Sequence, residues 1–171
     1  MVSPKNTFVD CLTVEQLNNL WKPDSTIMTW KDLDGAWPDK RINLYGPGTD
    51  SGTFDFFTEE IVGEVQSSRS DYSMSEDDNS LVKGISTDPN ALGYFGYAYY
   101  ASNPDKLKLV AVDDGNGCVD PSPETIKSGE YTPLARPLFI YVNADHLKNR
   151  PEVATFVKYF LTAGPELVAE V

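Results

Sequence analysis

One segment limits the possible folds of this chain more than any other: positions 44–54, which read LYGPGTDSGTF. It completes a short strand predicted at 41–45, and the Gly-Pro-Gly at 46–48 then breaks that strand sharply. The residues after the break predict a helix, for which either Ser51 or Thr49 can provide the N-cap. A strand that passes through a glycine-rich turn into a helix is typical of α/β folds.

Helical periodicity recurs on both sides of this segment. Thr13 and Gln16 have the spacing of a capping box that opens a short helix. The acidic group at 75–78 has the composition of an N-cap and first helical turn, and Pro151 is well placed to open a third helix. That last helix should turn an apolar face inward, formed by Val153, Phe156, Val157 and Phe160.

Further strands are expected between these helices. They are the beginning of 91–100, the run 107–112, and the run 137–142, which we expect to be buried. Strands that alternate with helices predict an α/β lobe with a central, mostly parallel sheet flanked by helices.

Charge excludes some classes of partner. The chain has 26 Asp and Glu against 14 Lys and Arg, for a net charge of −12. Nucleic acids and anionic membranes both require basic patches, so we expect neither as a partner. A small anion is not excluded, because close and well-aimed donors outweigh a distant, screened field.

Two cysteines, Cys11 and Cys118, are far apart in the sequence. Spacing alone leaves two buried free thiols and a disulfide as open alternatives. The single histidine, His146, gives a zinc site or a Ser-His-Asp triad little to work with. We therefore expect no metal site, no cofactor and no catalytic residues.

The turn at 48–53 carries the chemistry. The first turn of a helix has unpaired N–H groups and a partial positive charge, which suit an anion. Gly48 and Gly52 permit close approach of the backbone, while Ser51 and Thr53 add hydroxyl donors. No Gly-Lys-Ser/Thr follows, so the turn is not a nucleotide-binding P-loop. By pattern alone, an ordinary turn with a serine or threonine cap remains the alternative.

The longer segment 44–58, LYGPGTDSGTFDFFT, resembles the signature of the periplasmic phosphate-binding proteins of the high-affinity ABC uptake system. Similar stretches follow the order of that family over nearly the whole chain: 6–8, 11–13, Trp30, 68–69, 75–79, 91–100 and 136–142. The resemblance implies two α/β lobes that close on phosphate around a hinge. It also implies export to the periplasm, which favours a Cys11–Cys118 disulfide.

The phosphate ligands that we expect are Ser51, Gly52, Thr53, Thr49, Asp50 and Arg69. The Ser-Gly-Thr of 51–53 is the best supported by the resemblance. The family also has an arginine a few residues earlier, where this chain has Pro47, so Arg69 is our candidate for the replacement cation. A solvated loop arginine is the equally weighted alternative for Arg69. Asp50 either orients that arginine or caps the helix, and the cap is our preference. Arg136, at the expected hinge, is interpreted as structural.

The family is about twice as long as this chain. We expect 7–136 to be the second lobe, and 137–171 to be a return strand and helix that belong with a missing first lobe. No signal peptide is evident at the start of the sequence. The expected function is non-catalytic phosphate binding for delivery to an ABC permease, with half of the site present and a homodimer formed through the exposed C-terminal segment. The alternatives are a phosphate-ester hydrolase and a non-binding structural or sensing lobe.

Overall fold

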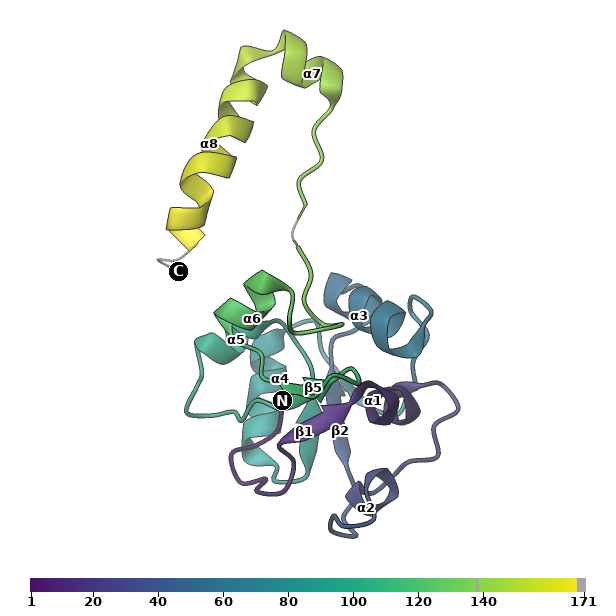
Figure 1. The fold of residues 1–171 in the computed structure, drawn as a ribbon. Coiled ribbons are helices and arrows are strands. Elements are labelled where there is room, and N and C mark those ends of the chain that lie inside the picture. Colours follow the sequence, from purple (N-terminus) through teal and green to yellow (C-terminus); the bar gives the residue numbers. More distant parts are fainter. Residues whose placement is uncertain (138, 169–171) are drawn as a thin grey trace. The chain divides into compact units, whose positions relative to one another are not determined.

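The computed structural model describes residues 1–137 and 139–168. The chain divides into two compact units, Met1–Arg136 and Pro137–Val171. The first unit contains two three-stranded sheets and the helices that pack on them (Figure 1). The second unit is helical, apart from an extended segment at its beginning.

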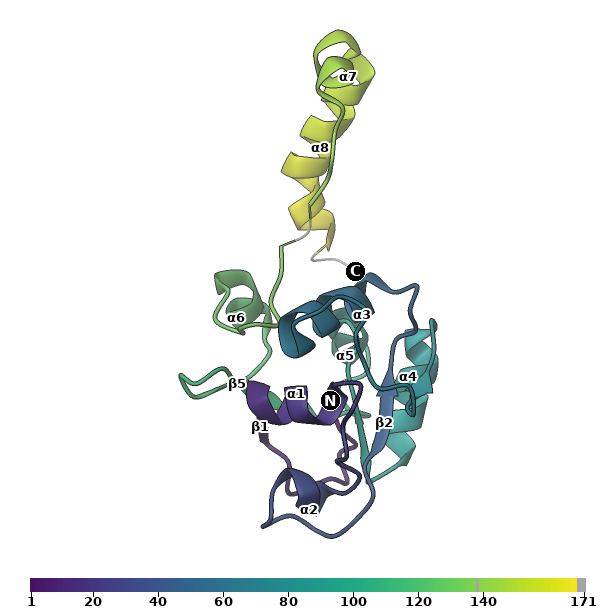
Figure 2. The same cartoon turned by 90° about the vertical axis from the view of Figure 1, so that its right-hand side faces the viewer.

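The first sheet holds the glycine-rich turn. Strand β2 (Asn43–Gly46) lies between β3 (Ser73–Met74) and β4 (Ala91–Gly93), and both neighbours run parallel to it. Helix α4 (Asp78–Thr87) packs against β2 and β4 (Figure 2). Its side chains Leu81, Val82 and Ile85 are buried, as the sequence pattern predicts for the inner face of a helix.

The second sheet holds the disulfide. Strand β1 (Cys11–Thr13) runs parallel to β5 (Ala111–Asp113), and β6 (Cys118–Val119) completes the sheet in the antiparallel direction. The predicted strand at 107–112 is therefore shorter and displaced, although Lys108 still forms an isolated bridge with Val2. Three of the four strand pairings in the two sheets are parallel, so the predicted mostly parallel α/β architecture is confirmed.

Local sequence signals set the ends of several helices. In α1 (Val14–Trp21) the predicted capping box forms, because the Thr13 side chain accepts from Gln16 N–H and the Gln16 side chain accepts from Thr13 N–H. Helix α3 (Gly52–Phe57) continues into the π-helix η1 (Thr58–Val62), which ends at Gly63 with φ 92°. The shorter helices of this unit are α2 (Trp30–Leu33), α5 (Tyr97–Ala101) and α6 (Pro123–Ser128).

Aromatic side chains form the core beside the turn. The buried Trp21 makes edge-to-face contacts with Phe57, Tyr72 and Tyr94, at centroid distances of 5.6, 5.4 and 5.0 Å. The rings of Phe57 and Tyr94 also stack, 3.7 Å apart. This cluster joins α1, α3, the residue before β3 and the residue after β4, and it supports the turn from inside the domain.

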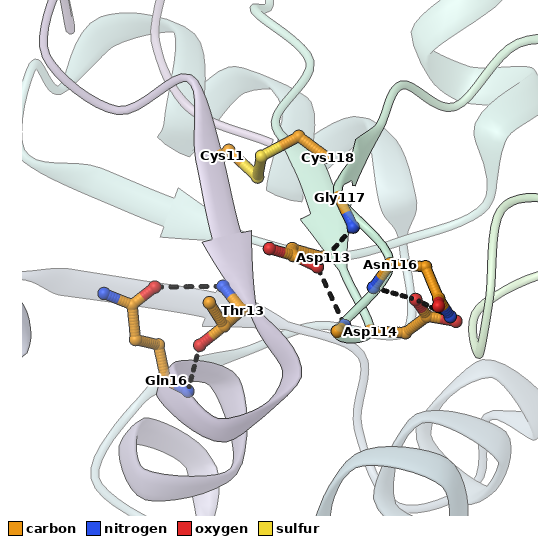
Figure 3. The surroundings of a disulfide bond; sticks show 9 residues. Cys11, Thr13, Gln16, Asp113, Asp114, Asn116, Gly117 and Cys118 are labelled. Atoms are coloured by element: carbon orange, nitrogen blue, oxygen red, sulfur yellow. Dashed lines mark hydrogen bonds between the residues drawn. A yellow bond between two sulfur atoms is a disulfide. The ribbon is translucent and has the colours of Figure 1, made fainter.

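The expected disulfide is present. Cys11 and Cys118 are bonded, and the bond closes a loop over a sequence separation of 107 (Figure 3). Between β5 and β6 the chain reverses through 113–117, where Asp113 Oδ1 accepts the N–H groups of Gly115 and Gly117. Both glycines have positive φ, 105° and 109°, which a residue with a side chain rarely adopts.

The second unit departs from the sequence prediction at its first segment. Residues 137 and 139–142 form no strand, and Phe139 and Tyr141 are 71% and 94% exposed, so the expected buried strand is wrong for these residues. Position 138 lies outside the described residues. The reason is physical: a strand needs a neighbour to accept and donate its backbone hydrogen bonds, and no described residue pairs with this segment.

Two helices follow, α7 (Ala144–Asn149) and α8 (Pro151–Val168). Helix α8 begins at Pro151 as predicted, but its expected inner face is only partly covered. Val153 and Val157 are half-buried, whereas Phe156 and Phe160 are 65% and 47% exposed. Across the described residues, no helix combines the length and the apolar character that spanning a bilayer requires.

Candidate functional site

The glycine-rich turn lies at the carboxyl edge of the sheet formed by β3, β2 and β4. This edge is where open parallel sheets usually hold ligands, because the loops after neighbouring strands meet there. The loop after β3 is tied to the turn, since Ser75 N–H donates to the Gly46 carbonyl at 3.2 Å. The predicted position of the site is therefore consistent with the topology.

The underside of the turn is fixed by two tyrosines. Tyr72 Oη donates to the carbonyl of the fully buried Pro47 at 2.8 Å. Gly46 lies against both rings: a Cβ there would be 3.0 Å from the Tyr94 ring and 3.2 Å from the Tyr72 ring. Burial raises the pKa of Tyr72 to about 12, with a further contribution from the charge of Glu76, so this hydroxyl stays a donor at neutral pH.

At the start of α3, several hydrogen-bond donors have no acceptor among the described residues. Ser51 is the N-cap: its hydroxyl oxygen accepts Thr53 N–H at 3.2 Å, and its own N–H donates to Gly48 O at 3.2 Å. Within the described residues, no hydrogen bond uses the N–H of Gly52, the N–H of Phe54 or the hydroxyl of Thr53. These are the groups that an anion at a helix N-terminus would receive.

A carboxylate also contacts the turn. Glu76 Oε1 accepts Asp50 N–H at 3.4 Å, and a Cβ on Gly48 would overlap that same oxygen. Thr49 and Asp50 are exposed. Because Ser51 provides the cap, the preferred interpretation of Asp50 as the helix cap is wrong. The alternative, in which Asp50 orients Arg69, has no contact to support it among the hydrogen bonds of Arg69.

Arg69 serves the interior of the domain. Its side chain is only 6% exposed, and it pairs with Asp71 through Nε at 2.6 Å and Nη2 at 2.9 Å. Nη1 donates to the carbonyls of Leu20 and Ile27, both at 3.0 Å, and Nη2 also contacts Met28 Sδ at 3.5 Å. A guanidinium has five N–H donors, and these contacts occupy all of them. This geometry speaks against Arg69 as a phosphate ligand.

A different arginine lies beside the turn. Arg136 Nη2 is 3.9 Å from the position that a Cβ on Gly52 would take, and the guanidinium carbon is 5.0 Å from the centre of the Phe56 ring. The side chain of Arg136 is exposed, so it is accessible to a ligand. Reasoning from the sequence missed this residue because nothing local connects it with Gly52. The one signal was Pro47, which indicated that the cation had to come from elsewhere.

The structure therefore brings together five of the six residues expected as ligands, while Arg69 lies apart from them and Arg136 lies near them. Positions 49–53 form one continuous turn at the sheet edge. Arg69 is held elsewhere by its own partners, and Arg136 lies beside Gly52. Such an arrangement can bind an oxyanion through backbone N–H groups, hydroxyls and one guanidinium.

Known proteins resemble this chain along most of its length. Residues 1–163 match the family model described as "PBP superfamily domain". Protein SphX from Synechocystis sp. is 49% identical over 161 residues, which cover 93% of this chain and 48% of that protein. The chain thus spans about half the length of the curated relatives that it matches.

Solved structures agree with the fold. A crystal structure described as a possible phosphate binding protein from Planctomyces limnophilus has 51% identity and a TM-score of 0.87, covering 99% of this chain and 60% of that one. A Clostridium perfringens structure named as a phosphate ABC transporter substrate-binding protein, with bound phosphate, has 25% identity and a TM-score of 0.74. It matches 99% of this chain and 64% of its own. Because the family model covers nearly the whole chain, the protein belongs to the PBP superfamily.

Proposed function

We propose that this chain binds inorganic phosphate non-covalently at the turn 49–53 and does no chemistry on it. The observation that carries the proposal is the set of free donors at the start of α3: the N–H groups of Gly52 and Phe54 and the Thr53 hydroxyl. The Ser51 hydroxyl, which already accepts a hydrogen bond, can add its proton. Support also comes from the 51% identical relative described as a possible phosphate binding protein and from the more distant one with bound phosphate.

The donors suit phosphate because a tetrahedral oxyanion accepts hydrogen bonds in several directions at once. Backbone N–H groups and hydroxyls do not titrate near neutral pH, so the turn at 49–53 keeps its hydrogen-bond donors over a wide pH range. Among the described residues, the Ser51 hydroxyl has no histidine or lysine partner that could act as a base. We therefore propose binding without catalysis, and turnover of a generic phosphate ester by the chain would favour the hydrolase alternative instead.

The affinity for phosphate depends on how many of the ligand residues belong to this chain. We propose that 7–136 acts as the second lobe of a two-lobe protein and that 137–171 packs with the other lobe. The exposed apolar side chains Phe139, Tyr141 and Phe156 support this division, because they are typical of a surface that a partner covers. By itself the chain should bind phosphate weakly, since the first lobe's donors and the closing motion that encloses a ligand are not available.

The biological context follows from the same relatives. We propose that the two-lobe protein collects phosphate in the periplasm and delivers it to the permease of an ABC importer. The exposed C-terminal segment could also pair two copies of this chain, so a homodimer is part of the proposal.

The test is a phosphate titration of the full chain followed by amide NMR. Saturable shifts should be centred on Gly52, Thr53 and Phe54, and a Ser51→Ala variant should weaken them several-fold. The matched control is Ser122→Ala. Ser122 is also the N-cap of a helix, α6, where its side chain accepts Thr125 N–H at 3.2 Å, and it lies outside the proposed turn. Both variants lose a cap that is worth about 1 kcal/mol. Equal effects of the two substitutions, or no saturable shift in the unmodified chain, would overturn the proposal.

A further inference from the structure

Arg136 is the strongest feature that the proposed function has not used. It is the last residue of the first unit, and its guanidinium nevertheless lies at the first turn of α3. We propose that Arg136 is the counter-ion of the phosphate site and sets its preference for doubly charged oxyanions. This inference rests on the proposed function, since it names the residue that neutralises the ligand of that same site.

One contact holds the guanidinium near the turn. Its carbon lies 5.0 Å from the centre of the Phe56 ring, within the range of a cation–π interaction. Nη2 lies close to Gly52, since a Cβ added to that glycine would be 3.9 Å from it. Gly52 and Phe56 both belong to α3, so the same helix that offers the free N–H groups also positions the arginine.

The guanidinium is also available. Among the described residues, the ion pairs of arginine belong to Arg69 and Arg150, and no carboxylate comes within ion-pair distance of Arg136. Its stacked face is covered by Phe56, whereas its N–H edge keeps its donors. An arginine in this state can give two parallel hydrogen bonds to one oxyanion.

The surroundings show why a cation is needed. The turn carries Asp50, Glu76 contacts it at Gly48, and Asp55 follows in the first turn of α3. A doubly charged anion placed among three carboxylates meets repulsion that neutral N–H donors offset only in part. A guanidinium beside Gly52 compensates this repulsion. A singly charged anion needs that compensation less, which is why the arginine should affect selectivity as well as affinity.

The experiment compares Arg136→Gln and Arg136→Lys with Arg41→Gln in the full chain. Arg41 is exposed and lies before β2, at the opposite end of the strand from the turn, so its substitution changes the net charge equally. Amide shifts of Gly52 report binding of inorganic phosphate, and of nitrate as a monovalent comparison, at several salt concentrations. Tryptophan fluorescence reports whether each variant is folded.

We expect Arg136→Gln to weaken phosphate binding roughly 5- to 20-fold, and nitrate binding by a smaller factor. The dependence of phosphate affinity on salt should also become shallower, because one charge has been removed from the site. Arg136→Lys should recover part of the affinity, and Arg41→Gln should stay within about two-fold of the unmodified chain. If phosphate shifts Gly52 with the same affinity in Arg136→Gln, the inference is wrong and the proposed function stands. If phosphate shifts Gly52 in none of the proteins, both are wrong.

Discussion

Replacement of Arg69 by methionine separates the two roles that an arginine can have in this domain. The sequence suggests Arg69 as a phosphate ligand, whereas its contacts place it inside the structure. A ligand arginine would affect binding and leave folding nearly unchanged. A structural arginine would do the opposite, so one substitution measured in two assays distinguishes them.

The expected loss of stability follows from the partners that the substitution leaves behind. The carbonyls of Leu20 and Ile27 each lose a donor, at about 1–3 kcal/mol for a buried polar group without a partner. Asp71 is 53% exposed and regains water, so its loss is small. Methionine fills part of the vacated volume. We therefore expect Arg69→Met to lower the free energy of unfolding by about 3–5 kcal/mol, a large part of the 5–15 kcal/mol that is typical of a domain.

Urea unfolding followed by tryptophan fluorescence reports on the structural unit that contains Arg69, because Trp21, Trp30 and Trp37 all belong to Met1–Arg136. Arg41→Met, at an exposed position, is the control and should stay within about 0.5 kcal/mol of the unmodified chain. In the folded fraction, phosphate should shift the Gly52 amide of Arg69→Met with unchanged affinity. The reasoning fails if Arg69→Met unfolds like the control while its phosphate affinity falls about ten-fold, which is a loss of about 1.4 kcal/mol of binding free energy.

Four further expectations can be checked with the same methods. Glu76→Gln should raise phosphate affinity about two- to five-fold in the amide titration, because it removes a negative charge beside the turn. Cys11→Ser should lower the free energy of unfolding by up to about 4 kcal/mol, measured against the chain with its long disulfide loop intact. Phe156→Glu should abolish any concentration-dependent dimer in analytical ultracentrifugation, because it places a charge on the exposed apolar face of α8. The hydrogen bond from Arg69 lowers the pKa of Asp71, so the ion pair should stabilise the fold above about pH 4 and be lost as the pH falls through that lowered value. Asp71→Asn should remove this acid-dependent part from urea titrations.

Sequence reasoning succeeded where structure is decided by neighbours along the chain. The capping box of Thr13 and Gln16 depends on contacts within a few residues, and so does the cap at Ser51, one of the two alternatives that the helix pattern left open. The position of the candidate turn between β2 and α3 was predictable for the same reason. These local signals are reliable because a helix end exposes the same unpaired backbone groups in any fold.

It failed where a partner far away in the sequence decides the outcome. The segment 137–142 has the apolar, β-branched and aromatic composition of a strand, yet in its described residues it pairs with nothing. Strand propensity describes how well a segment fits a sheet, and it cannot say whether a sheet is there to receive it. The exposed Tyr141 and the partly covered face of α8 have the same cause.

The excess of acidic residues helps to explain why Arg136, and not Arg69, is the arginine proposed as the cation of the phosphate site. Carboxylates outnumber cationic side chains by 26 to 14, so a cation in this chain often has an acidic residue close to it in the sequence. Arg69 pairs with Asp71 and Arg150 with Glu152, in both cases only two positions along the chain. No acidic residue lies within five positions of Arg136 on either side. An arginine that has no ion pair among the described residues is available to an external anion, and this availability favours Arg136 over Arg69, whose guanidinium is held by Asp71.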